Sequence, residues 1–136
     1  MLSFADLNWL AVLVAGLAYF VLGAVWYSEP LMGRQYRSAL GLEPDRSGTP
    51  EPKSLIVNLV GWLVSALALA LVMVAAGASG VGDGILFGLV VGVGMVVSQM
   101  LVTSTYEGRG HALFKVNAPY AIIGYIVMGI ILATWR

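Results

Sequence analysis

The sequence contains no cysteine, only one histidine and few charged residues. The absence of cysteine excludes disulfides, thiolate metal sites and thiol catalysis. Charged residues make up 10% of the chain and hydrophobic residues 60%, whereas soluble domains carry about 25% charge. Seven basic residues balance seven acidic ones, so the basic excess of a nucleic-acid-binding surface is missing. These deficits point to a membrane protein with no nucleic-acid partner.

Apolar runs occupy most of the 136 residues. A hydrocarbon core of about 30 Å requires about 20 helical residues, because lipid offers no hydrogen bonds to the backbone. Four segments reach this length: residues 7–27, 55–77, 85–105 and 112–135. We therefore expect a single all-α domain (1–136), an integral membrane bundle of four transmembrane helices with an uncleaved first helix. We expect the lipid bilayer to surround this bundle.

Basic residues are expected mainly on one side of this bundle. The connections after the first and third helices, with the start of the fourth helix, hold Arg34, Arg37, Arg46, Lys53, Arg109 and Lys115. Arg136 is the only basic side chain expected on the other side. Because cytoplasmic loops are enriched in Lys and Arg, we expect both connections in the cytoplasm and both termini outside.

The first connection divides into two parts. In residues 30–42, apolar residues recur at helical spacing while Arg34 and Arg37 share another face, which predicts a short interfacial helix. Residues 43–54 are rich in proline, serine and charge, and predict a flexible cytoplasmic tether. Anchoring explains both parts, and a partner-binding element is the alternative.

Glycines spaced four residues apart mark one face of the third helix: Gly84, Gly88 and Gly92. Such a face lets another backbone approach closely. Contact within one bundle is the simpler explanation, because short connections bring neighbouring helices together. A homo-oligomer interface is the alternative.

Polar residues in the spans are candidates for a functional site, because their burial in lipid is costly unless they find partners. The candidate polar site near the cytoplasmic ends comprises Asn58, Gln99, Tyr106, Glu107, Arg109 and Asn117. Gln99 and Thr103 are one turn apart and can share a face. The alternative is structural, with these groups serving only as hydrogen-bonding partners within or between helices.

No enzyme template fits the chain. A zinc or copper site cannot be assembled around His111 alone, and the serines lack a histidine at a suitable depth. Small multidrug resistance transporters couple protons through an acidic residue deep in a helix. The acidic residues nearest the spans here lie at or beyond helix ends: Asp6, Glu29, Asp83 and Glu107. We expect no enzymatic activity, no cofactor and no metal.

A short internal echo suggests a parallel duplication. The first and third helices end in a tyrosine with a glutamate nearby, and Val-Asn pairs occur at 57–58 and 116–117. If the duplication is real, these residues converge at the cytoplasmic ends.

Several motifs resemble one known family nearly from end to end. They are Asn8-Trp9, Trp26-Tyr27-Ser28 followed by Pro30, Tyr106-Glu107-Gly108-Arg109 and Val116-Asn117-Ala118. Together they are similar to the bacterial membrane family catalogued as domain of unknown function 1761 (DUF1761). The resemblance implies a small four-helix protein of unassigned activity in the bacterial plasma membrane. The family often has a glycine and a histidine around the tyrosine after the fourth-helix asparagine, where this chain has Pro119-Tyr120-Ala121.

From these features we expect a structural or accessory subunit that packs with itself, as a homo-oligomer, or with a larger membrane complex. The alternative is a small-solute channel or transporter whose pathway includes Asn58, Gln99 and Asn117. Pro119 predicts a kink in the fourth helix, because it cannot donate to the carbonyl of Lys115.

Overall fold

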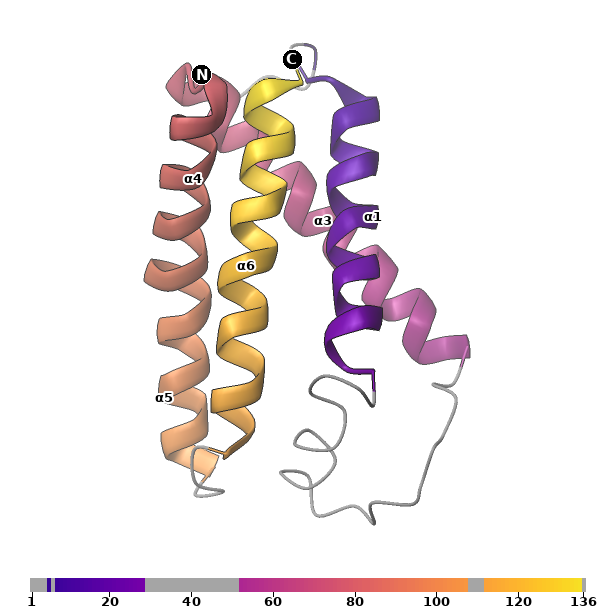
Figure 1. Cartoon of the computed structure of the whole chain (residues 1–136), viewed down its shortest axis with the longest axis vertical. Coiled ribbons are helices and arrows are strands. Elements are labelled where there is room, and N and C mark those ends of the chain that lie inside the picture. The colour runs from indigo at the N-terminus through magenta and orange to yellow at the C-terminus, as the bar shows by residue number, and fades with distance from the viewer. Residues whose placement is uncertain (1–4, 6, 29–51, 108–111, 136) are drawn as a thin grey trace.

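The structure, a computed structural model, describes residues 5, 7–28, 52–107 and 112–135 (Figure 1). Its elements are α1 (Trp9–Trp26), α3 (Pro52–Ala76), α4 (Gly80–Val91), the π-helix η3 (Gly92–Val97), α5 (Ser98–Glu107) and α6 (Ala112–Thr134). The segments α4, η3 and α5 follow one another without a break and form one long helix. Four helices are long and apolar enough to cross a membrane, which confirms the expected all-α fold with four spans.

Some expectations lie outside the described residues, namely the interfacial helix at 30–42, the tether as far as residue 51, and Arg109. Residues 52–54, expected to end the tether, are instead the first residues of α3. Pro52 suits the first position of a helix, because the N–H that it lacks has no partner there and its fixed φ is helical. The third helix is also longer than expected, since it runs from Gly80 to Glu107.

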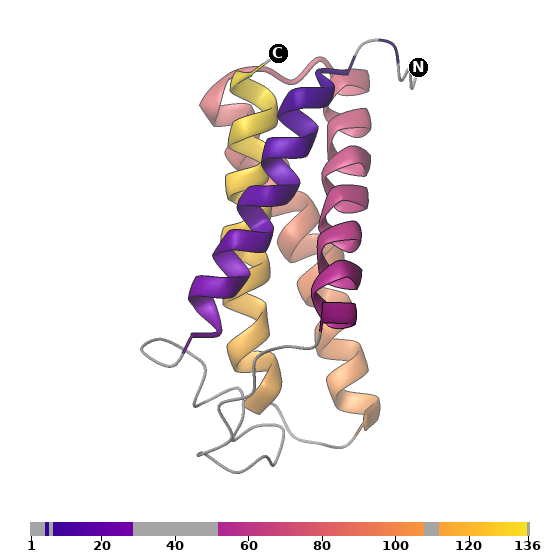
Figure 2. The same ribbon diagram turned by 90° about the vertical axis from the view of Figure 1, so that its right-hand side faces the viewer.

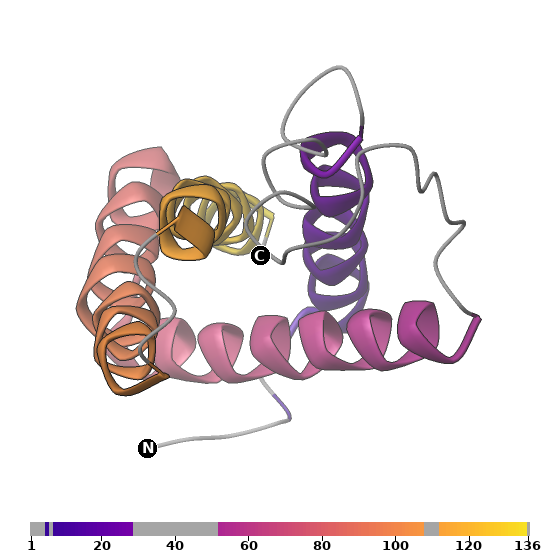
Figure 3. The same cartoon turned by 90° about the horizontal axis from the view of Figure 1, so that it is seen from below.

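The helices form a bundle in which α6 lies between α4 and α1, while α3 crosses behind them (Figures 1 and 2). Seen from below, α3 extends along one side of the bundle (Figure 3). The Asn8 side-chain amide donates to the Trp135 carbonyl oxygen at 3.2 Å, which joins the beginning of α1 to the end of α6. We call this the terminus end of the bundle, and the opposite end, where α1 finishes and α3 starts, the connection end.

Burial is concentrated on α6. In the apolar stretches of the spans, 56% of the residues of the fourth are buried within the chain, against 11% for the third. The glycine face of the third helix packs on α6: a Cβ at Gly84 would lie 2.6 Å from the Gly129 carbonyl oxygen, and a Cβ at Gly88 would lie 2.6 Å from Ile126 Cα. These backbones approach closely only because glycine lacks a side chain.

The third helix extends beyond its neighbours at the connection end. It has 28 residues, or about 42 Å at 1.5 Å per residue, whereas a hydrocarbon core needs about 30 Å. In Figures 1 and 2, α5 and the beginning of α6 continue past the level at which α1 ends and α3 begins. This end of the bundle therefore carries a projecting helical pair.

Candidate functional site

Six aromatic rings gather where α1, α3 and α6 meet, and we call them the aromatic cluster: Tyr19, Trp26, Tyr27, Trp62, Tyr120 and Tyr125. Tyr19 stacks on Trp62 with a centroid distance of 4.0 Å and an interplanar angle of 9°. Tyr120 meets the edge or face of Tyr19 at 4.8 Å and of Tyr27 at 5.2 Å. Such T-shaped contacts add about 0.5–1.5 kcal/mol each to the stability gained from burial.

Two tyrosines of this cluster each pack on a glycine of the opposite helix. Tyr19 of α1 lies over Gly124 of α6, where an added Cβ would be 2.5 Å from the ring atom Cζ. Tyr120 of α6 lies over Gly23 of α1, where an added Cβ would be 2.6 Å from the tyrosine hydroxyl oxygen. Each helix thus receives a tyrosine from the other, and the close packing of α1 on α6 depends on both pairs.

Hydrogen bonds from α1 to α6 continue this contact toward the connection end. The Trp26 indole N–H donates to the Val116 carbonyl oxygen at 3.0 Å, and the Tyr27 hydroxyl donates to Asn117 Oδ1 at 2.5 Å. Farther inside, the Tyr120 hydroxyl donates to the Tyr19 carbonyl oxygen at 3.1 Å. Within a membrane such bonds satisfy polar groups that water cannot reach.

The bond from Trp26 lies next to the helical defect that the sequence predicts at Pro119. A proline inside a helix removes one backbone donor and crowds the preceding turn, so neighbouring groups must support it. The indole N–H of α1 reaches the backbone of α6 within this turn. The structure thus joins the proline region of α6 to the end of α1.

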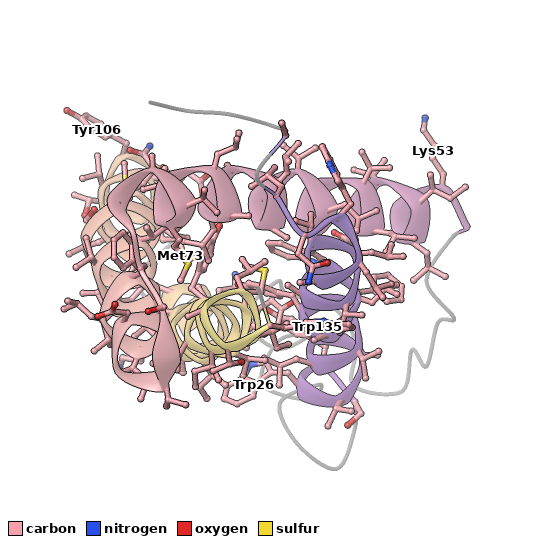
Figure 4. The ribbon with its side chains drawn as sticks, turned by 90° about the horizontal axis from the view of Figure 1, so that it is seen from above. Trp26, Lys53, Met73, Tyr106 and Trp135 are labelled. Carbon is pink, nitrogen blue, oxygen red and sulfur yellow. The ribbon has the colours of Figure 1, made fainter. Side chains whose placement is uncertain are left out.

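The structure places the members of the candidate polar site on three helices. Asn117, on α6, is half-buried and bound to Tyr27. Asn58, on α3, is exposed, and Gln99, on α5, is exposed and donates to Thr103 Oγ1 at 3.3 Å. Tyr106 is 87% exposed and points away from the bundle (Figure 4).

The remaining members are Glu107, which is exposed, and Arg109, which lies outside the described residues. The residues of the suggested internal duplication also lie in two different environments. Tyr27 and Asn117 are half-buried and bonded to each other, whereas Tyr106 and Asn58 are exposed on separate helices. The two halves of the chain are therefore not equivalent in their surroundings.

Sequence reasoning did not single out the aromatic cluster. Tyr19 and Trp62 resemble ordinary residues of apolar spans, and only Gly124 and Gly23, which face Tyr19 and Tyr120, could have indicated the contact. The π-helix at Gly92–Val97 was also missed. Its signal was weak, because two glycines in an apolar run fit an α-helix equally well.

The cluster is suited to rigid packing. Its polar groups are tyrosine hydroxyls, indole N–H groups and one neighbouring amide, and the six rings include no acidic or basic side chain. A cavity of about 30 Å³ lies elsewhere, at the terminus end, lined by Leu7, Asn8, Ala11, Ala70, Val74, Leu132 and Trp135. This volume suits a water molecule.

Comparison with known proteins identifies a family but no activity. No curated protein and no solved structure matches the chain. The family described as "Protein of unknown function (DUF1761)" matches residues 10–133, nearly the whole sequence. With its four membrane-spanning helices, this multi-pass membrane protein belongs to the DUF1761 family.

Proposed function

We propose that the chain is a noncatalytic structural or accessory subunit that assembles with itself or with a larger complex in the bacterial plasma membrane. The observation that carries the proposal is the uneven burial of its helices. The fourth helix is covered by the bundle, while the third has 11% of its apolar stretch buried and α5 buries no residue. A helix with polar groups and so little cover inside its own chain is suited to contact another protein.

The rigidity of the aromatic cluster supports the same role. Stacked rings, reciprocal glycines and bonds between α1 and α6 hold three helices in one arrangement. A scaffold that presents a fixed outer surface requires this kind of core, whereas alternating access requires helices that move against each other. The proposed orientation, with both termini outside, rests on the distribution of Lys and Arg.

The test is to determine composition and solute flux for the same preparation. Native mass spectrometry of the tagged protein from its own host should give a fixed multiple of the 14.4 kDa chain, or a fixed ratio with one other membrane protein. Proteoliposomes containing the purified chain should shrink and recover in glycerol or urea at the rate of protein-free vesicles.

The alternative, a small-solute pathway, predicts the opposite pattern. Flux above that of protein-free vesicles, reduced by Asn58→Leu or Gln99→Leu, would favour a pathway and contradict the accessory role. A monomer with no companion and no flux would also contradict assembly.

A further inference from the structure

Four exposed side chains follow one another along the outer side of the third helix, and we call them the α5 seam: Met95, Gln99, Val102 and Tyr106. Their spacing of four, three and four residues is that of the d and a positions of a coiled coil. Met95 is 66% exposed, Val102 49% and Tyr106 87%. The chain therefore carries an uncovered seam with the periodicity of helix pairing.

Lipid offers no hydrogen-bonding partner to the polar member of this surface, Gln99. Val102 and Tyr106 belong to α5, which continues past the level where α1 ends and α3 begins (Figures 1 and 2). Gln99 makes one hydrogen bond within the described part of the chain, the bond to Thr103. A glutamine amide has two N–H donors and an acceptor oxygen, so Gln99 keeps a donor and its oxygen available. Contact with another protein helix would satisfy the polar member of the seam by a hydrogen bond, and its apolar members would gain van der Waals packing.

The π-helix η3 turns this seam outward. Gln99 follows Gly88 by eleven positions, close to three α-helical turns, so a continuous α-helix would place the two residues within about 20° of each other around the helix axis. Gly88 is buried against α6, yet Gln99 is exposed. A π turn takes up one extra residue and rotates the following side chains by about 100°. It therefore allows the glycines to face α6 while Gln99 faces away from the bundle.

The seam fits a second copy of the same chain. Membrane insertion gives all copies one orientation, so a two-fold axis along the membrane normal sets each seam residue opposite itself. Glutamine suits this position because its amide both donates and accepts, and a single polar residue at an a position fixes helix register.

We propose that the chain forms a parallel two-fold dimer through the α5 seam, with the Gln99 amides of the two copies hydrogen-bonded to each other. The proposal rests on the assembly role above and names its first partner. Met95 packs against its equivalent on one side of this amide pair, and Val102 and Tyr106 pack on the other.

Cross-linking tests the dimer, since the absence of cysteine makes every single-cysteine variant unambiguous. Met95→Cys keeps Gln99 and should give an oxidant-dependent dimer in native membranes. Val60→Cys is the matched control, because Val60 is 53% exposed on α3, outside the seam. We expect at least fivefold more dimer from Met95→Cys than from Val60→Cys.

Substitution of Gln99 then tests the amide pair. In the Met95→Cys background, Gln99→Leu should reduce the dimer about three- to tenfold, consistent with loss of an interhelical hydrogen bond in a membrane. Gln99→Asn should retain part of it. Expression and thermal stability of the monomeric chain should be unchanged, because the hydrogen bond of Gln99 within the described residues joins it to Thr103 of its own helix, and its side chain is exposed.

Equal cross-linking at Met95 and Val60 would overturn the proposal, and so would a dimer that is unaffected by Gln99→Leu. The results that reject the dimer differ from the results that reject the accessory role. A fixed complex with another protein and no cross-link at Met95 rejects the dimer alone, whereas a cross-linked dimer that transports solute rejects the accessory role alone.

Discussion

Individual glycines and tyrosines set the distances between helices in this bundle. Gly84 and Gly88 bring α4 onto α6, and the pairs Tyr19 with Gly124 and Tyr120 with Gly23 bring α1 onto α6. Because the nearest atoms at Gly84 and Gly88 belong to backbone, an added side chain there cannot be relieved by a rotamer change. Single substitutions should therefore have large and position-dependent effects.

Gly88→Ala tests this in the middle of the glycine face. The new Cβ would meet Ile126 Cα at 2.6 Å, so the helices must separate, at a cost of about 1–3 kcal/mol. Gly82→Ala is the control on the same helix, because its Cβ would meet nothing within 4 Å. Thermal unfolding in mild detergent should show a lower midpoint for Gly88→Ala only. Equal midpoints for the two variants would contradict the close α4–α6 contact.

Removal of the Tyr120 hydroxyl and removal of the Tyr19 hydroxyl should have different effects on the free energy of unfolding. The Tyr120 hydroxyl donates to the Tyr19 carbonyl oxygen, whereas the buried Tyr19 hydroxyl makes no hydrogen bond within the described part of the chain. Tyr120→Phe should cost about 1 kcal/mol of unfolding free energy, and Tyr19→Phe should be neutral or stabilising. Unfolding titrations of both variants check this. A loss at Tyr19→Phe as large as that at Tyr120→Phe would show that the Tyr19 hydroxyl has a bonding partner.

Among the elements, the third helix departs furthest from expectation. Hydropathy predicts its existence well, but it cannot distinguish an α-helix from one interrupted by a π segment. Ser98 stabilises the interruption: its backbone N–H bonds to the carbonyls of Val93 and Met95, and its hydroxyl donates to the Gly94 carbonyl oxygen at 2.7 Å. In a regular α-helix the Gly94 carbonyl oxygen would accept from the backbone N–H of Ser98. In the π-helix it accepts from the Ser98 hydroxyl instead.

Ser98→Ala should therefore destabilise this helix by about 0.5–1.5 kcal/mol. Thr105→Ala is the control, because its hydroxyl donates to the Leu101 carbonyl oxygen within the regular turns of α5. Hydrogen–deuterium exchange of the third helix should rise around residues 92–98 in Ser98→Ala and stay unchanged there in Thr105→Ala. Unchanged exchange in both variants would argue against the hydroxyl as the support of the π-helix.

The whole molecule has two chemically different ends. Positive residues in the connections predict that the connection end faces the cytoplasm, and the positions of the helix ends are consistent with two termini on one side. In this bundle the third span is the least buried of the four, with 11% of its apolar stretch buried, although its glycine face packs on α6.

Single cysteines can test the orientation. Gly48→Cys, in the first connection, should resist a membrane-impermeant thiol reagent in intact cells and react after lysis. Ser79→Cys, at the exposed turn between α3 and α4, should react in intact cells. The reverse labelling pattern would show that the termini lie in the cytoplasm.

The number of spans, the all-α class and the family follow from the sequence, because length and hydropathy are local properties that lipid selects directly. The glycine face was also visible as a spacing of four residues. The candidate polar site was less predictable, since hydropathy gives the depth of a residue and not its direction around the helix. Asn117 obtained a partner from α1, while Asn58 and Gln99 were left exposed.

Tertiary structure alone decided which helix each face meets. The glycines of the third helix could have packed on any neighbour, and the contact with α6 depends on how all four helices share limited space. The π-helix then fixed the direction of Gln99, because one extra residue in a turn redirects every side chain that follows. Composition determines that lipid surrounds the chain. Helix rotation and packing determine which polar groups remain available to a partner protein.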